Sequence, residues 1–219
     1  MTDVLEKIRK VFEDLMLHRT FFVSEADFQH AFAMKLANTF QAETDRIYLE
    51  FPVELDGDYV AHIDIMLMHD GKKYPIELKY KTKKTDCQDV LDNSGIMACK
   101  LLKNQGAGDL GAYDFLYDIH RIESIQEKCA GVAIILTNDP WYWTQGKRKS
   151  ICDNFRIYHG RTIAGELEWN IDIEQQNNPN HFTKKRPGFG LNNTYTCEWK
   201  QKSDKSEFKY LYIEVPPKK

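Results

Sequence analysis

Long hydrophobic runs are missing from this chain, and so is any cysteine pairing motif. No segment approaches the roughly 18 consecutive apolar residues that a transmembrane helix needs. The amino terminus is polar, so we expect no signal peptide there. These absences predict a cytoplasmic protein that has no membrane partner.

Cysteine is scarce, and its arrangement argues against disulfide and zinc chemistry. The five cysteines are odd in number, widely spaced and without a Cys-x-x-Cys pair. We therefore expect reduced thiols with a structural role. The residues are Cys87, Cys99, Cys129, Cys152 and Cys197.

The chain also lacks an extreme composition. Charged residues make up 29% and hydrophobic residues 42%, which is typical of a globular protein with a substantial core. The net charge of −3 is unevenly distributed: residues 1–139 hold 16 Lys and Arg against 24 Asp and Glu, whereas residues 140–219 hold 14 against 9. The basic second part could bind a phosphate backbone, although ordinary surface variation explains the asymmetry about as well.

The periodicity of apolar residues predicts an α/β order of elements. Helical spacing predicts helices over 3–17, from Ser24 onward, and over 109–128 with Asp109 as N-cap. Alternation predicts a three-stranded meander over 46–54, 58–68 and 74–81. The unbroken apolar run 131–137 predicts a central strand, reached by a parallel crossover.

The chain changes character after residue 140, where aromatic and basic residues gather. We expect strands at 154–158 and 162–171, a loop over 174–193, and a closing hairpin of 195–200 with 207–215. Trp141-Tyr142-Trp143 is expected to be core or interface rather than a platform for stacked bases. The prediction is one domain over 1–219, with a core at about 20–139 and a β-rich extension over 140–219.

The most informative segment is the predicted hairpin of residues 60–81. Asp70-Gly71 between alternating strands predicts a two-residue type I′ turn. With that turn, Asp64 faces Glu77 and His62 faces Lys79, with facing Cβ atoms about 4.5–5.5 Å apart. Alternation places Asp64, Glu77, Lys79 and Lys81 on one sheet face, and the apolar residues Ile63, Ile65, Leu67, Ile76, Leu78 and Tyr80 on the other.

Two carboxylates held this close repel each other unless a cation neutralises them. A hard divalent ion is the natural occupant, because Mg²⁺ prefers oxygen ligands and often takes only one or two protein carboxylates. Lys79 adds a positive charge where a phosphate oxygen or an activated water would lie. The pattern suits metal-assisted phosphodiester hydrolysis, whereas the competing interpretation is a solvated face with an incidental charge pattern.

Asp64, the hairpin turn and then Glu77-Leu78-Lys79 resemble the signature of the PD-(D/E)XK nuclease superfamily. The family core runs helix, three-stranded meander, helix, strand, which is the order predicted over residues 24–137. The resemblance implies a restriction-endonuclease-like fold with a mixed sheet flanked by helices, here followed by a β-rich C-terminal extension. The chain departs from the pattern in having no proline before Asp64, and its subfamily is left open.

The resemblance also implies an activity and a set of site residues. The expected activity is that of a metal-dependent nuclease, an endonuclease of the restriction, repair or defence type that hydrolyses DNA with Mg²⁺ or Mn²⁺. Asp64, Glu77 and the backbone carbonyl of Leu78 would hold the ion, and Glu25 would complete its shell through water. Lys79 would position the attacking water or stabilise the transition state. Duplex cutting in the family often uses dimers, so a homodimer is one expectation.

Other polar residues have two interpretations each. Basic residues near the site or in the extension could contact a nucleic-acid backbone, or could simply solubilise strand ends and turns. His62 could assist proton transfer, although a bordering position is favoured. Asp118, His120 and Glu123 are predicted to lie on a polar helix face and to meet only water. The candidate nucleic-acid contacts are Lys81, Lys83, Lys84, Lys147, Arg148, Lys149, Lys184, Lys185 and Arg186.

Two functions from other classes stay open on the sequence alone. A catalytically inactive nucleic-acid-binding or scaffold domain could retain the same fold. A metal-dependent hydrolase of a small phosphoester would use the same residues, but would show no salt-sensitive binding to DNA.

Overall fold

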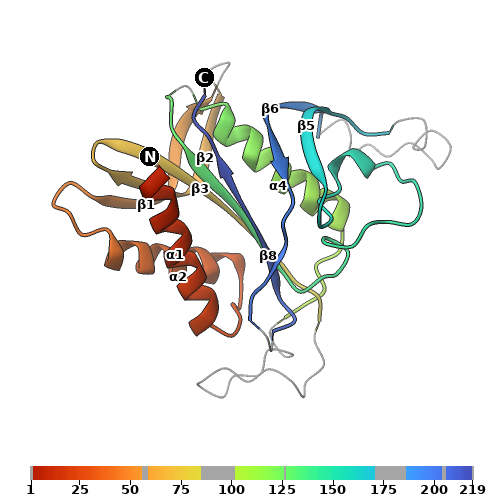
Figure 1. The fold of residues 1–219 in the computed structure, drawn as a ribbon, viewed down its shortest axis with the longest axis horizontal. Helices are drawn as coiled ribbons and strands as arrows, with labels where there is room; N and C mark the ends of the chain where they lie inside the picture. The colour runs from red at the N-terminus through yellow and green to blue at the C-terminus, as the bar shows by residue number, and fades with distance from the viewer. Residues whose placement is uncertain are drawn as a thin grey trace.

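A mixed sheet of six strands runs through the centre of the described chain, which comprises residues 2–55, 59–84, 102–125, 127–170, 186–203 and 206–218 of a computed structural model (Figure 1). The strand order is β1-β2-β3-β4-β8-β7; β3 and β4 are parallel and the other neighbours antiparallel. The elements are α1 (Thr2–His18), α2 (Glu25–Thr39), β1 (Arg46–Leu55), β2 (Tyr59–His69), β3 (Lys72–Lys81), α4 (Gly108–Glu123), β4 (Gly131–Thr137), η1 (Asp153–Phe155), β5 (Thr162–Leu167), β6 (Phe189–Thr196), β7 (Lys200–Gln201) and β8 (Lys209–Val215).

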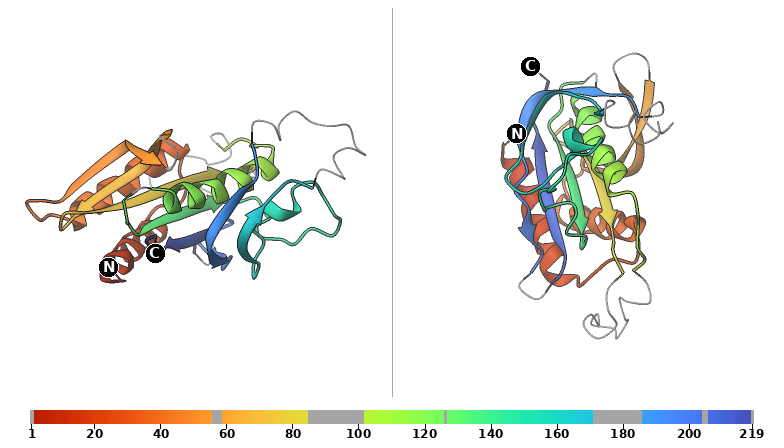
Figure 2. Two further views of the ribbon diagram at one scale, coloured as in Figure 1. Left: turned by 90° about the horizontal axis from the view of Figure 1, so that it is seen from above. Right: turned by 90° about the vertical axis from the view of Figure 1, so that its right-hand side faces the viewer.

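Helices cover both faces of the central sheet (Figures 1 and 2). On β3, Leu78 and Tyr80 point to the face that packs against α1 and α2. On β4, Ala133 and Ile135 point to the opposite face and pack with α4. Every residue of β4 is therefore buried, as its unbroken apolar run predicts. The α/β class with a mixed sheet flanked by helices is confirmed.

The N-terminal helix pair is set by local signals in the sequence. Ser24 caps α2, because its side chain accepts the N–H of Asp27 at 3.1 Å. Phe28, Phe32 and Leu36 then recur every four residues and are buried against the sheet. The position of this helix matters for the site, since its first turn lies beside β3.

Segments beyond residue 140 contribute to the central sheet as well as to a second one. β8 pairs with β4 from Gly131–Val215 to Thr137–Lys209, so it extends the main sheet. β5 and β6 form a separate two-stranded sheet whose apolar residues pack with α4. Tyr142 is buried, and Trp141 and Trp143 pack against the same cluster, which confirms the prediction that this aromatic run is core.

Several sequence-based boundaries are wrong. The strand expected at 154–158 is the 3₁₀ helix η1, and β6 already begins at Phe189, inside the expected loop. Helix α4 ends at Glu123 instead of 128, and its N-cap is Ala107 in a left-handed conformation, so Asp109 lies inside the first turn. The closing hairpin consists of β7 and β8.

Two further findings concern absences noted in the sequence. Within the described residues no helix has the length and apolarity needed to cross a bilayer. Cys129, Cys152 and Cys197 are free and buried, while Cys87 and Cys99 lie outside the described residues.

Candidate active site

The β2–β3 turn fixes the register of the strands that carry the predicted site. Asp70 and Gly71 both have positive φ, at 50° and 70°, as a type I′ turn requires. The pairing that follows runs from His69–Lys72 to Ile65–Ile76. The two-residue turn and its register are therefore confirmed.

The regular pairing of β2 and β3 stops one residue short of the carboxylates. Asp64 does not continue the backbone ladder; its Oδ2 accepts the N–H of Leu78 at 2.6 Å. The expected pairing of His62 with Lys79 is absent, because the β2–β3 ladder ends at Ile65–Ile76; His62 is exposed and pairs only with Pro52 of β1 among the described strands. The two strands separate at Asp64, and from there two backbone N–H groups of β3 donate to side-chain carboxylates instead of to β2.

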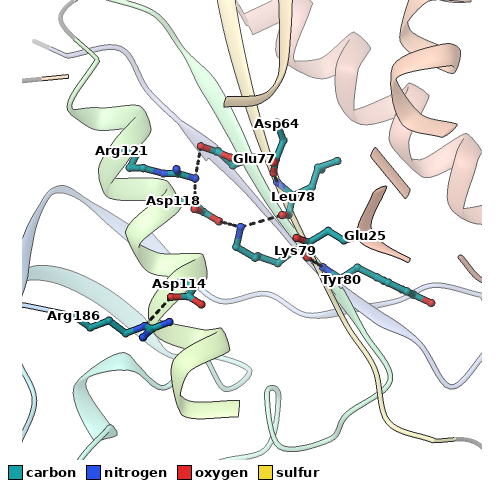
Figure 3. A network of polar contacts seen from close by, with 10 residues as sticks. All are labelled: Glu25, Asp64, Glu77, Leu78, Lys79, Tyr80, Asp114, Asp118, Arg121 and Arg186. Atoms are coloured by element: carbon teal, nitrogen blue, oxygen red, sulfur yellow. Dashed lines mark hydrogen bonds and ion pairs between the residues drawn. The ribbon is translucent and has the colours of Figure 1, made fainter. Parts of the chain in front are cut away.

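Helix α2 supplies the groups that fill the gap between the strands. Glu25 Oε2 accepts the N–H of Tyr80 at 2.7 Å. One turn later, Gln29 Nε2 donates to the carbonyl of Asp64 at 2.6 Å and to Glu50 Oε1 at 2.8 Å. The structure thus brings Glu25 to the same strand as Glu77 and Lys79 (Figure 3). It also adds Gln29 as a positioning residue.

On the other face of β3, Glu77 and Lys79 meet helix α4 (Figure 3). Arg121 Nη2 lies 2.7 Å from Glu77 Oε1 and 2.7 Å from Asp118 Oδ1. Lys79 Nζ lies 2.8 Å from Asp118 Oδ2 and donates to the Leu78 carbonyl at 3.3 Å. The prediction that Asp118 meets only water is wrong, since α4 packs this polar side against the sheet.

The same prediction fails for the two other polar residues of that helix. Glu123 is buried and accepts hydrogen bonds from the N–H groups of Asn192 and Asn193 and from the Tyr195 hydroxyl. His120 Nδ1 lies 2.8 Å from the Gly190 carbonyl. Both residues bind α4 to β6, so their role is structural.

Glu77 is the most unusual group of the site. Its side chain is 0% exposed, and in the ionised form neither oxygen accepts a hydrogen bond from a described residue. Among the described residues it forms an ion pair with Arg121 and, when protonated, a hydrogen bond with Asp64. Burial, followed by the nearby Asp118 carboxylate, raises the pKa of Glu77 well above its usual value, although Arg121 opposes the shift.

The pKa values of Asp64 and Lys79 are also shifted from those of the free side chains. Burial raises the pKa of Asp64, while Lys79, the Leu78 N–H and a hydrogen bond with protonated Glu77 act against this shift. Burial alone would lower the pKa of Lys79, but the carboxylates of Asp118, Asp64 and Glu25 outweigh it and raise that pKa. Lys79 is therefore an ammonium group at neutral pH.

The coupled groups carry an excess of negative charge. Among the described residues, the largest electrostatic interactions of this cluster join the four carboxylates of Glu25, Asp64, Glu77 and Asp118 with the two cations Lys79 and Arg121. With every group ionised, this leaves a balance of −2 in a largely buried place. Uncompensated buried charge is costly, and a divalent cation would offset it.

The chemical type of the available donor atoms, which are oxygens, matches a hard divalent cation. Two adjacent carboxylates and the Leu78 carbonyl supply oxygen, the ligand type that Mg²⁺ prefers, and Mg²⁺ retains several waters. Over the described ranges, no group of three or more His, Cys, Asp or Glu side chains is arranged to hold a metal ion. An ion would therefore depend on the carbonyl and on water or substrate oxygens as well.

The predicted nucleic-acid contacts are scattered over the molecule. Lys83 pairs with Asp139 at 3.1 Å, and Arg186 pairs with Asp114 of α4 at 3.2 Å, away from the central cluster (Figure 3). Lys81 is half-buried near the end of β3 and Lys84 is exposed. Lys147, Arg148 and Lys149 are exposed in the loop after β4, whereas Lys184 and Lys185 lie outside the described residues.

Comparisons with protein-family models, curated proteins and solved structures give no match for this chain.

Sequence reasoning missed three residues of the site. Asp118 and Arg121 stand three positions apart on α4, and Gln29 stands four after Glu25 on α2. Each lies one helical turn from another polar residue of the site, which is the spacing that places two side chains on one helix face. That spacing is the signal that could have identified them.

Proposed function

We propose that this protein is a metal-dependent nuclease with a restriction-endonuclease-like core, which hydrolyses phosphodiester bonds of DNA. The observation that carries the proposal is the fully buried Glu77 carboxylate, which lies beside Asp64 and Lys79 and, when ionised, has the ion pair with Arg121 but accepts no hydrogen bond from a described residue. A purely structural carboxylate is normally satisfied, as Glu123 is on the same helix that contacts Glu77. A buried carboxylate without hydrogen bonds, close to further carboxylates, is a candidate ligand for a cation.

In this proposal Asp64, Glu77 and the Leu78 carbonyl hold Mg²⁺ or Mn²⁺, and Glu25 contributes through water. The bound ion lowers the pKa of a water ligand and neutralises charge on the phosphate. Glu25 already stabilises the geometry by accepting the Tyr80 N–H.

Lys79 acts in this proposal as a cationic donor. Because its pKa is raised by the surrounding carboxylates, it carries a proton at neutral pH and cannot serve as a general base there. It can instead orient the attacking water and stabilise negative charge that develops on the phosphate. Asp118 fixes the ammonium group at 2.8 Å and thereby sets its position.

The test is a cleavage assay over single-stranded, duplex and branched DNA and RNA, with Mg²⁺, Mn²⁺ or chelator. We expect divalent-dependent cutting that falls about 100-fold or more in Lys79→Ala and in Glu77→Ala. Lys72→Ala is the matched control, because Lys72 is exposed at the other end of the same strand. Wild-type rates in both site variants would refute the mechanism.

A non-catalytic nucleic-acid-binding or scaffold domain is the second candidate. The observation in its favour is that Arg121 and Lys79 already form ion pairs inside the cluster, so part of the negative charge is neutralised internally. A scaffold would show no Mg²⁺-dependent rise in melting temperature. A nuclease would show a rise that disappears in Asp64→Ala.

A further inference from the structure

The loop that follows β4 encloses a basic cavity that is separate from the carboxylate cluster. The cavity has a volume of about 360 Å³. Its lining contains five cationic side chains and one carboxylate. The cations are Lys147, Arg148, Lys149, Arg156 and Arg161, and the carboxylate is that of Asp153. The run Lys147-Arg148-Lys149 is recognisable in the sequence, whereas Arg156 and Arg161 are brought beside it only by the fold.

The two deeper arginines are held in place by neutral groups. Arg156 stacks over the Trp141 ring at 4.0 Å, and its Nη2 donates to the carbonyls of Trp141 at 3.1 Å and Thr144 at 2.7 Å. Arg161 Nη1 donates to the carbonyl of Arg156 at 2.6 Å, and its Nη2 to that of Asn154 at 3.0 Å. These contacts orient both guanidinium groups without neutralising either charge.

Within the described part of the chain, the cations that line this cavity outnumber its one carboxylate by five to one, and that carboxylate, Asp153, acts electrostatically on Arg161. None of its five cations forms an ion pair with a described carboxylate, and the buried Nε of Arg156 has no acceptor there. The one carboxylate, that of Asp153, accepts hydrogen bonds from the N–H and the hydroxyl of Ser150. Burial lowers the pKa of Arg161, and the Arg156 charge acts in the same direction.

We propose that this cavity binds a phosphate group. Phosphate matches the fork of an arginine, accepts several charge-assisted hydrogen bonds, and would supply the missing negative charge. The preferred source is a backbone phosphate of the nucleic-acid substrate, a choice that rests on the proposed nuclease function. A free phosphoester offers the same chemistry and is distinguished experimentally.

The first experiment titrates inorganic phosphate at constant ionic strength, in chelator, with tryptophan fluorescence and melting temperature as readouts. Trp141 lies against Arg156, so its emission should respond to an anion in the cavity. We expect saturable binding in the wild type that weakens about tenfold or more in Arg156→Gln and in the double variant Arg148→Gln with Lys149→Gln. The double variant changes only exposed residues, so it should fold even if Arg156→Gln does not.

The matched control is Lys72→Gln with Lys128→Gln, which makes the same change in net charge at exposed sites outside the cavity. Equal phosphate affinity in the double variant and the control would overturn the proposal. So would the absence of a saturable response in the wild type.

The second experiment identifies the source by measuring anisotropy of a labelled oligonucleotide in chelator. A tenfold or greater loss of affinity in the double variant, with a log–log salt slope smaller by about 2 than that of the control, identifies backbone phosphates. Binding of phosphate or a mononucleotide with unchanged oligonucleotide affinity identifies a free phosphoester. Since hydrolysis is not required, failure of the cleavage assay would leave both results readable.

Discussion

Replacing Glu77 by glutamine should stabilise the metal-free protein while abolishing its activity. The substitution preserves the shape of the side chain but removes an ionisable carboxyl group, whose ionisation is costly because the side chain is 0% exposed and lies near the Asp118 carboxylate. An unsatisfied buried polar group costs about 1–3 kcal/mol, and more when it is charged. The glutamine amide still carries the cost of an unsatisfied neutral polar group, and it loses the attraction to Arg121, but it avoids the additional cost of a buried charge.

The net gain in the free energy of unfolding should therefore be about 1–2 kcal/mol at pH 7.5 in chelator, the usual size for relief of a strained functional group. For a chain of this length, each kcal/mol raises the melting temperature by about 2–4 °C. We expect a rise of about 2–8 °C, measured by a thermal melt. Glu54→Gln, an exposed change on β1, is the matched control and should leave the melting temperature unchanged.

The pH dependence tests the same reasoning with a definite sign. The pKa of Glu77 is raised in the folded state, so the unfolded chain loses this proton at lower pH. The stability that the neutral carboxyl contributes is therefore present in acid and lost as pH rises through the folded-state pKa. The advantage of Glu77→Gln should grow over that interval and shrink when Mg²⁺ is added. A variant that is less stable than the wild type in chelator at pH 7.5 would refute the argument.

Two of the three remaining predictions concern residues of the site, and the other concerns a buried lysine beside the end of α1. Arg121→Met leaves two buried carboxylates without their shared cation and should cost about 3–5 kcal/mol in chelator by denaturant titration, with partial recovery in Mg²⁺; an unchanged midpoint would contradict the ion-pair assignment. Lys202→Met removes a buried ammonium group that donates to two carbonyls at the end of α1, and should cost about 1–3 kcal/mol in the same titration. Glu25→Gln keeps an acceptor for the Tyr80 N–H but loses the charge, so it should reduce kcat/KM about 10–100-fold with little change in melting temperature.

The sequence predicts the parts of the site that depend on local rules. The Asp70-Gly71 turn determines the register of β2 and β3, and the Ser24 cap determines where α2 begins, so Glu25 could be placed in its first turn. Both features depend on residues close together in the chain. They are recoverable without knowledge of the packing.

The rest of the site depends on tertiary packing and could not be predicted. The β2–β3 pairing ends at Ile65–Ile76 because side chains from a preceding helix occupy the gap. Asp118 is polar by type, and only the docking of α4 on β3 shows that its face is buried. The strand expected at 154–158 failed for a similar reason, since Phe155 is a core residue presented by a 3₁₀ turn.

The side-chain acceptors on β3 have a consequence for how the site can be observed. The amides of Leu78 and Tyr80 are held by the carboxylates of Asp64 and Glu25 instead of by a neighbouring strand. Their hydrogen-exchange rates should therefore follow the protonation and occupation of the site, while the amides between Ile65 and His69 follow the sheet. Two backbone positions in the middle of the molecule thus serve as built-in reporters of the chemistry beside them.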